Sequence, residues 1–163
     1  MAGSGVHLAI GEEVVSRLLA AEDDAGVIAI VGRIEANLDA RYVFSTDRAW
    51  DALHRCLTDG TLALDAGSFP LSHAVLGGVQ LCEDDGFLVS LVRPDQVPAV
   101  ADALTPIDRD WLRRRYYSFE FPDYEGLRGE EDFDEAWHCV TGLAGFFQIA
   151  AHDHRSVIFT VDL

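Results

Sequence analysis

The chain has 163 residues, of which 28 are acidic and 12 basic, so its formal net charge at pH 7 is −16. Every basic residue is an arginine, and the absence of lysine excludes Schiff-base enzymes, pyridoxal-phosphate anchoring, Walker phosphate loops and the strand lysine of protein kinases. The acidic balance also argues against direct binding to nucleic acid or to an anionic membrane, because such binding needs clustered positive charge.

The size and the 49% apolar content predict a single globular domain over residues 1–163. The three cysteines, Cys56, Cys82 and Cys139, are widely spaced and form no CxxC motif, which indicates reduced thiols. The N-terminal segment lacks the basic start of a signal peptide, and no stretch reaches the roughly 18 apolar residues of a membrane helix. We therefore expect a cytoplasmic protein.

The N-terminal part of the chain shows one strand pattern and two helix patterns. Residues 6–10 alternate between apolar and small or polar side chains, which predicts a strand with one buried face. Residues 12–21 predict a short helix that starts with two glutamates. Residues 27–38 are rich in β-branched side chains, which favours a strand, but their apolar spacing is helical, and we expect a helix.

The next helix is predicted over residues 47–58, with Ser45 or Thr46 as its N-cap. Its apolar face includes Trp50, and its other face carries polar side chains that are expected to be solvated: Asp47, Asp51, His54 and Arg55. Residues 67–78 then form a compact segment between turn signals.

The C-terminal half predicts two strands and three helices. The strands cover residues 86–92, which are almost continuously apolar, and residues 157–162, which alternate. The helices run from Pro94 to Leu104, from Asp108 through Tyr116, and along an apolar stripe from Phe133 to Ala151. Residues 120–135 hold eight acids and one arginine, which predicts an exposed loop. The fold class is therefore α+β, a small mixed or antiparallel sheet with several packed helices.

Several segments together resemble those of the YfbM-like family, a small bacterial single-domain family of unknown function. They are TDRAWDALHRCLTDG (46–60), PLSHAVLGG (70–78), VSLV (89–92), WLRRRYY (111–117) and VIFTVD (157–162). The resemblance implies an α+β fold and a soluble bacterial protein. It implies no catalytic, binding or cofactor residues.

Two groups of residues have the chemistry of a hydrolase. Asp51 and His54 lie three positions apart on a helix, a spacing at which a carboxylate can orient an imidazole for general-base catalysis. The same spacing is typical of a solvated face with an Asp51–Arg55 ion pair. Ser72 is a possible nucleophile beside His73, but in an extended segment their side chains point to opposite sides, so the base would come from elsewhere. Hydrogen bonds within the local turn are the simpler interpretation.

Two further tracts have simple structural interpretations. His152 and His154 flank Asp153 and resemble part of a metal site, but they also oppose the negative end of a helix, and a metal site needs more ligands. Residues 113–115 form the one basic patch, beside two tyrosines, and nearby acids can pair with it.

We therefore expect a binding module with an acidic surface, inhibitor- or immunity-like, whose partner is another protein and whose contact face is the acidic segment 120–135. The alternative is a small hydrolase with a pocket built from Asp51, His54, Ser72 and His73, and a bound ligand would contact Trp50, His54 and His73. No cofactor is expected. Metal binding through His152 and His154 is a third hypothesis, and the oligomeric state is open.

Overall fold

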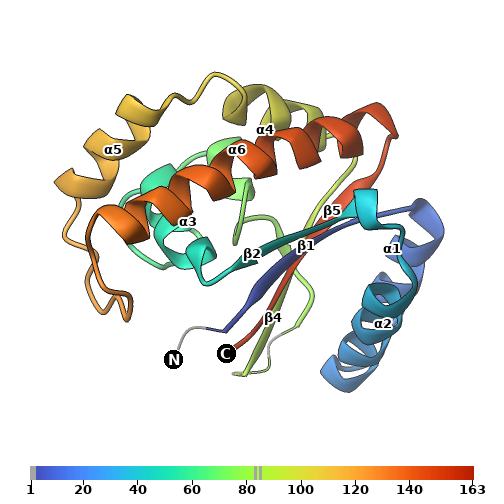
Figure 1. The fold of residues 1–163 in the computed structure, drawn as a ribbon. Coiled ribbons are helices and arrows are strands. Elements are labelled where there is room, and N and C mark those ends of the chain that lie inside the picture. Colours follow the sequence, from blue (N-terminus) through green and yellow to red (C-terminus); the bar gives the residue numbers. More distant parts are fainter. Residues whose placement is uncertain (1–2, 83, 85) are drawn as a thin grey trace.

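The computed structural model describes residues 3–82, 84 and 86–163. Its centre is a five-stranded sheet in the order β2–β1–β5–β4–β3, in which every neighbouring pair is antiparallel (Figure 1). The strands are β1 (Gly5–Ile10), β2 (Val43–Asp47), β3 (Val79–Gln80), β4 (Phe87–Val92) and β5 (Ser156–Asp162). Because β1 and β5 pair antiparallel in the middle of the sheet, the start of β1 lies beside the end of β5 (Figure 1).

Helices cover both faces of this sheet (Figure 1). One face carries α3 (Ala49–Leu57), α4 (Val97–Leu104) and α6 (Glu130–His152), and α5 (Arg109–Ser118) packs against α3 and α6. The other face carries α1 (Glu12–Leu19) and α2 (Asp24–Asn37). Two short 3₁₀ turns, Ala40–Tyr42 and Leu71–His73, complete the described elements. The predicted α+β class is confirmed.

The alternation along the central strands divides the core into two. In β5, Val157, Phe159 and Val161 belong to the larger core under α3–α6, whereas Ile158 belongs to the smaller core under α1 and α2. This follows from the period of two in a strand, which sends successive side chains to opposite faces. The patterns at residues 6–10 and 157–162 predicted the strands, but residues 6–10 were expected to have one buried face, whereas helices bury both faces of β1 and β5.

Local signals also explain where several helices begin. The Asp23 carboxylate accepts a hydrogen bond from the Gly26 amide at the start of α2, and Asp108 does the same for Trp111 in α5. The ambiguous segment 27–38 is helical, because its apolar side chains pack as one stripe against the smaller core. The long C-terminal helix is confirmed as α6, and no helix in the described part of the chain is long and apolar enough to cross a membrane.

Two local predictions are wrong. Ser45 and Thr46 do not cap α3, because they lie in β2, an edge strand that turns into the helix through Asp47 at a φ of 44°. Residues 130–135 are not part of a loop, because the acidic residues at this point start α6. Negative side chains stabilise the positive N-terminal end of a helix, so the same acids are compatible with either structure.

Candidate functional site

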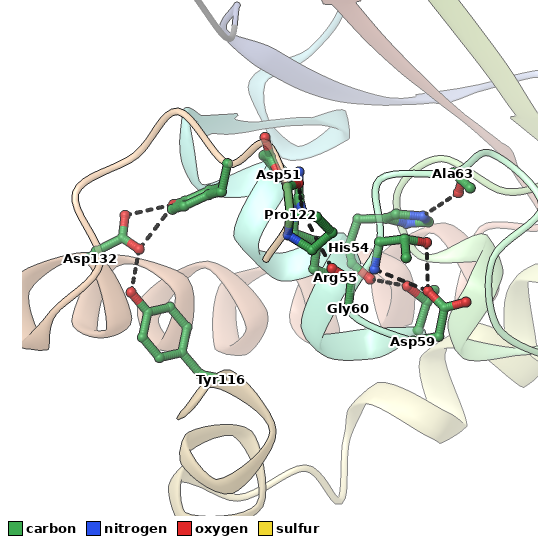
Figure 2. A network of polar contacts seen from close by, with 12 residues as sticks. Asp51, His54, Arg55, Asp59, Gly60, Ala63, Tyr116, Pro122 and Asp132 are labelled. Carbon is green, nitrogen blue, oxygen red and sulfur yellow. Dashed lines mark hydrogen bonds and ion pairs between the residues drawn. The ribbon is translucent and has the colours of Figure 1, made fainter. Parts of the chain in front are cut away.

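The polar side of α3 is buried, not solvated as its sequence predicts. Arg55 and Asp51 are only 1% and 4% exposed. The Arg55 guanidinium donates to the carbonyl oxygens of Gly60, at 3.3 Å, and Pro122, at 2.7 Å (Figure 2). The chain segments around these two carbonyls lie over the helix. The helical pattern alone shows that this side is polar, but not that other segments cover it.

Asp51 and Arg55 form the expected ion pair, in a desolvated setting. The Arg55 Nε atom lies 2.6 Å from Asp51 Oδ1, one helical turn apart (Figure 2). Burial raises the pKa of Asp51, and the hydrogen bond and charge of Arg55 oppose that rise. The pair therefore holds two charges out of water, and each compensates the other.

A second polar cluster joins the start of α6 to α5 and to the segment before α6. The Asp132 carboxylate accepts hydrogen bonds from the hydroxyls of Tyr116, at 2.5 Å, and Tyr124, at 2.8 Å (Figure 2). Burial, followed by the hydrogen bond to Asp132, raises the pKa of Tyr116 to about 12 and raises the pKa of Tyr124 as well. Both tyrosines are therefore neutral donors at physiological pH.

Arg128 holds the same segment from its other end. Its guanidinium donates to the carbonyl oxygens of Phe119 and Tyr116 and lies 4.0 Å from the centre of the Phe121 ring. The guanidinium thus combines hydrogen bonds with a cation–π contact. The acidic segment before α6 has a defined conformation, although its composition is typical of a solvated loop.

These contacts surround a cavity of about 340 Å³ between α3, the segment at 124–127 and the first turns of α6. We call it the acidic cleft, and its lining residues are Arg48, Asp51, Tyr124, Glu125, Gly126, Leu127, Glu131, Asp132 and Glu135. Of the described residues that line the cleft, five carry carboxylates and one, Arg48, is cationic. In the described part of the chain, Glu131 and Glu135 form no ion pair. The cleft is therefore suited to a positively charged group.

Trp50 and His54, two of the residues expected to contact a ligand, are both buried in the protein. The Trp50 indole donates to the Gly3 carbonyl oxygen at 2.8 Å and packs against Phe159. His54 Nε2 lies 2.9 Å from the Ala63 carbonyl oxygen, so it carries the proton, and burial lowers the pKa of the ring. His54 Nδ1 is buried and has no hydrogen-bond partner among the described residues.

Ser72 and His73 contact each other, contrary to the expectation from an extended segment. They lie in the 3₁₀ turn Leu71–His73, and Ser72 Oγ is 2.9 Å from His73 Nδ1. In a 3₁₀ turn the side chains of consecutive residues can point to the same side and contact each other, whereas in a strand they point to opposite faces. Both residues line a cavity of about 410 Å³ with Phe69 and Gln80.

The four residues of the hydrolase hypothesis do not meet in one described cavity. Asp51 lines the acidic cleft, Ser72 and His73 line the second cavity, and His54 lines neither. The serine and histidine are together, but the carboxylate that was expected to orient the imidazole is bonded to Arg55 instead.

The remaining tracts have structural partners. His152 is 90% exposed in its side chain and contacts Asp153 at 3.0 Å. Within residues 3–82, 84 and 86–163, no group of three or more His, Cys, Asp or Glu side chains is arranged to hold a metal ion. In the basic patch, Arg113 pairs with Glu130 and Arg115 donates to the Cys56 and Thr58 carbonyl oxygens. The three cysteines are free and buried.

Sequence reasoning missed the tyrosines and the arginine that organise the cleft. Tyr116, Tyr124 and Asp132 are far enough apart in the chain that no local motif joins them. The one available signal was Arg128, the single cation among eight acids, because an arginine in such a segment has carboxylates and carbonyls to bind.

Residues 1–160 match the family model described as a domain of unknown function, DUF1877. Over 115 residues the chain is 36% identical to protein YfbM of Escherichia coli (strain K12), a match that covers 69% of this chain and 65% of that protein's own length. The crystal structure of YfbM from Escherichia coli, described as a protein of unknown function, superposes with a TM-score of 0.73 at 25% sequence identity and covers 99% of both chains.

Proposed function

Since this chain belongs to the DUF1877 family, whose description names no activity, we propose from its geometry that it is a binding module for a basic segment of a partner protein. The segment binds in the acidic cleft. The observation that carries this proposal is the set of five carboxylates that line one cavity with a single arginine.

The charge of the cleft supports a cationic partner. Glu131 and Glu135 have no cationic partner in the described part of the chain. A bound arginine or lysine can therefore form an ion pair with them without breaking an existing one. The net charge of −16 attracts such a partner over a longer range and raises its association rate.

The cleft also has the rigidity and the apolar contact that a binding site needs. Arg55 and Arg128 hold the segment before α6 through carbonyl oxygens, so little conformational entropy is lost when a partner binds. Leu127 is 91% exposed at the edge of the cleft. A partner segment that alternates basic and aliphatic side chains would contact both the carboxylates and this leucine.

The test measures binding of a hexapeptide of alternating arginine and leucine by isothermal titration calorimetry. We expect the variant E131Q/E135Q to weaken binding roughly tenfold, from two lost charge interactions. The matched control is E12Q/E13Q, which makes the same charge change on exposed residues of α1, on the other face of the sheet. Equal weakening by both variants, or by neither, would contradict the proposal.

We infer a second candidate function, hydrolysis of an acyl ester at Ser72, from the 2.9 Å contact between Ser72 Oγ and His73 Nδ1. Burial lowers the pKa of His73, so the ring is neutral and able to accept a proton. Ser72 Oγ would bond to the acyl carbon while its proton passes to His73 and then to the departing alkoxide, and water would release the acid.

This candidate is tested with p-nitrophenyl butyrate. Hydrolysis by the wild-type protein that is lost in both S72A and H73Q supports an enzyme. Hydrolysis that is absent from the wild type, or unchanged in S72A, excludes Ser72 as a nucleophile and leaves the binding proposal as it stands.

A further inference from the structure

Arginines are scarce in this acidic chain, and most of them are bonded to the protein itself. Five pair with a carboxylate: Arg41, Arg55, Arg93, Arg109 and Arg113. Three others donate to backbone carbonyl oxygens of other segments: Arg115, Arg128 and Arg155. The rest, Arg17, Arg33, Arg48 and Arg114, have no ion-pair partner within the described residues.

Two of these remaining arginines line the same cavity. Arg17 of α1 and Arg33 of α2 lie at a groove of about 330 Å³ between the two helices. Arg33 makes one hydrogen bond, from Nε to the Ala29 carbonyl oxygen of its own helix at 3.4 Å. Within the described residues, neither guanidinium pairs with a carboxylate, although the chain has 28 acids.

Apart from the two arginines and Asn37, the described residues that line this groove are apolar. Val14 of α1 and Ile30, Ile34 and Leu38 of α2 and its C-terminal end line it, and they pack against the smaller core of the protein. We call these four residues, with Arg17 and Arg33, the arginine groove. The helices that form it, α1 and α2, lie on the face of the sheet opposite α3 and α6 (Figure 1). Among the described residues, none that lines the groove carries a carboxylate.

We propose that the arginine groove binds a free medium-chain fatty acid, with the alkyl chain between α1 and α2 and the carboxylate at Arg17 and Arg33. A guanidinium matches the geometry of a carboxylate and donates two parallel hydrogen bonds to it. Each methylene of the alkyl chain that leaves water adds to the affinity. The volume is at the lower end of small-molecule sites, which selects a single short chain over a diacyl lipid.

The site does not depend on the acidic cleft or on Ser72, because it shares no residue with either cavity. Its failure would therefore leave the proposed function unchanged. Loss of the acidic cleft should likewise leave the arginine groove unchanged, so we expect E131Q/E135Q to bind the fatty acid as the wild type does.

The experiment titrates decanoate, below its micelle concentration, into the full chain by isothermal titration calorimetry. The expected result is saturable binding of one decanoate, with shifted NMR signals for the methyl groups of Val14, Ile30 and Ile34. In R17Q/R33Q the affinity should fall at least about tenfold, since each variant residue loses a charge-assisted hydrogen bond. Both arginines are exposed, so these variants are expected to fold.

The matched control is R114Q, which removes an exposed arginine of α5 that also has no ion-pair partner in the described chain. It should bind decanoate as the wild type does. Decanol that binds as tightly as decanoate would overturn the role of the arginines, and R17Q/R33Q with unchanged affinity would do the same. A concentration-dependent dimer in light scattering that I30E abolishes would show that a second copy occupies the groove, and would also overturn the proposal.

Discussion

Arginines on the two faces of the sheet have different partners. On the side of α3–α6, Arg55 and Arg128 are bonded to carboxylate or carbonyl oxygens that hold chain segments together. On the side of α1 and α2, Arg17 and Arg33 bond to no other segment of the described chain. On the first side, loops connect four helices of the described chain, α3 to α6, and several chain segments are joined by arginine hydrogen bonds. The second side has two consecutive helices.

This difference determines the charge of each candidate site. On the side of α3–α6 most arginines are bonded within the fold, and carboxylates outnumber Arg48 among the described residues that line the cleft, so the cleft is acidic. Where the fold needs no such bonds, the arginines themselves are left over, and the groove between α1 and α2 is basic. A net charge of −16 for the whole chain therefore conceals two sites of opposite sign.

The largest effect is expected at Arg55. In R55M the Asp51 carboxylate stays buried without its partner, and we expect a loss of about 3–5 kcal/mol in the free energy of unfolding, measured in urea. The double variant D51N/R55M should recover part of that loss, because no buried charge remains uncompensated. A loss below about 1 kcal/mol in R55M would show that the pair does not hold this face together.

A smaller effect concerns His7, whose ring lies in the larger core between Phe147 and Phe159 and bonds to the Ala74 carbonyl oxygen at 2.7 Å. Burial lowers the pKa of His7 to about 4, from 6.5 in the unfolded chain. The unfolded state therefore binds the proton more readily, and the stability from the neutral ring is complete above pH 6.5 and is lost as the pH falls towards 4. Between pH 7 and pH 5 the loss is about 2 kcal/mol.

The measurement for His7 is urea unfolding across that pH range for the wild type and for H7Q, which keeps a donor for Ala74 but does not titrate. We expect a shallower pH dependence in H7Q. Identical slopes would show that His7 is not the group responsible.

A third effect, of about 1 kcal/mol, is expected for Y124F, which removes the hydrogen bonds from the Tyr124 hydroxyl to Asp132. The loss should appear in urea unfolding. Because the segment before α6 would be less rigid, the arginine–leucine peptide should also bind less tightly. Unchanged peptide affinity in Y124F would show that binding depends on the charge of the cleft and not on the rigidity of this segment.

The smallest effect is expected on the other face. R17Q/R33Q should change the free energy of unfolding by no more than about 0.5 kcal/mol, as surface substitutions without a structural partner do. A loss comparable with that of R55M would contradict the contrast between the two faces, because it would show that these arginines also hold the fold together.

The sequence predicted the regular elements well and the site poorly, for one reason. Strand alternation and helical apolar stripes are local patterns, so the strands at residues 6–10 and 157–162 were predicted from spacing, whereas their pairing and the two cores that they separate appear only in the structure. The polar face of α3 follows the same spacing, but its burial depends on Pro122, 67 residues from Arg55. The resemblance to the YfbM-like family is confirmed, and it names no site.

The sequence by itself therefore determined the family, the α+β class, the position of most helices and strands, and the excess of negative charge. The tertiary structure decided which charged side chains are bonded within the protein, because their partners belong to segments that are distant in the sequence. Asp51 and Arg55 compensate each other in the interior, whereas Glu131, Glu135, Arg17 and Arg33 line cavities and have no ion-pair partner among the described residues.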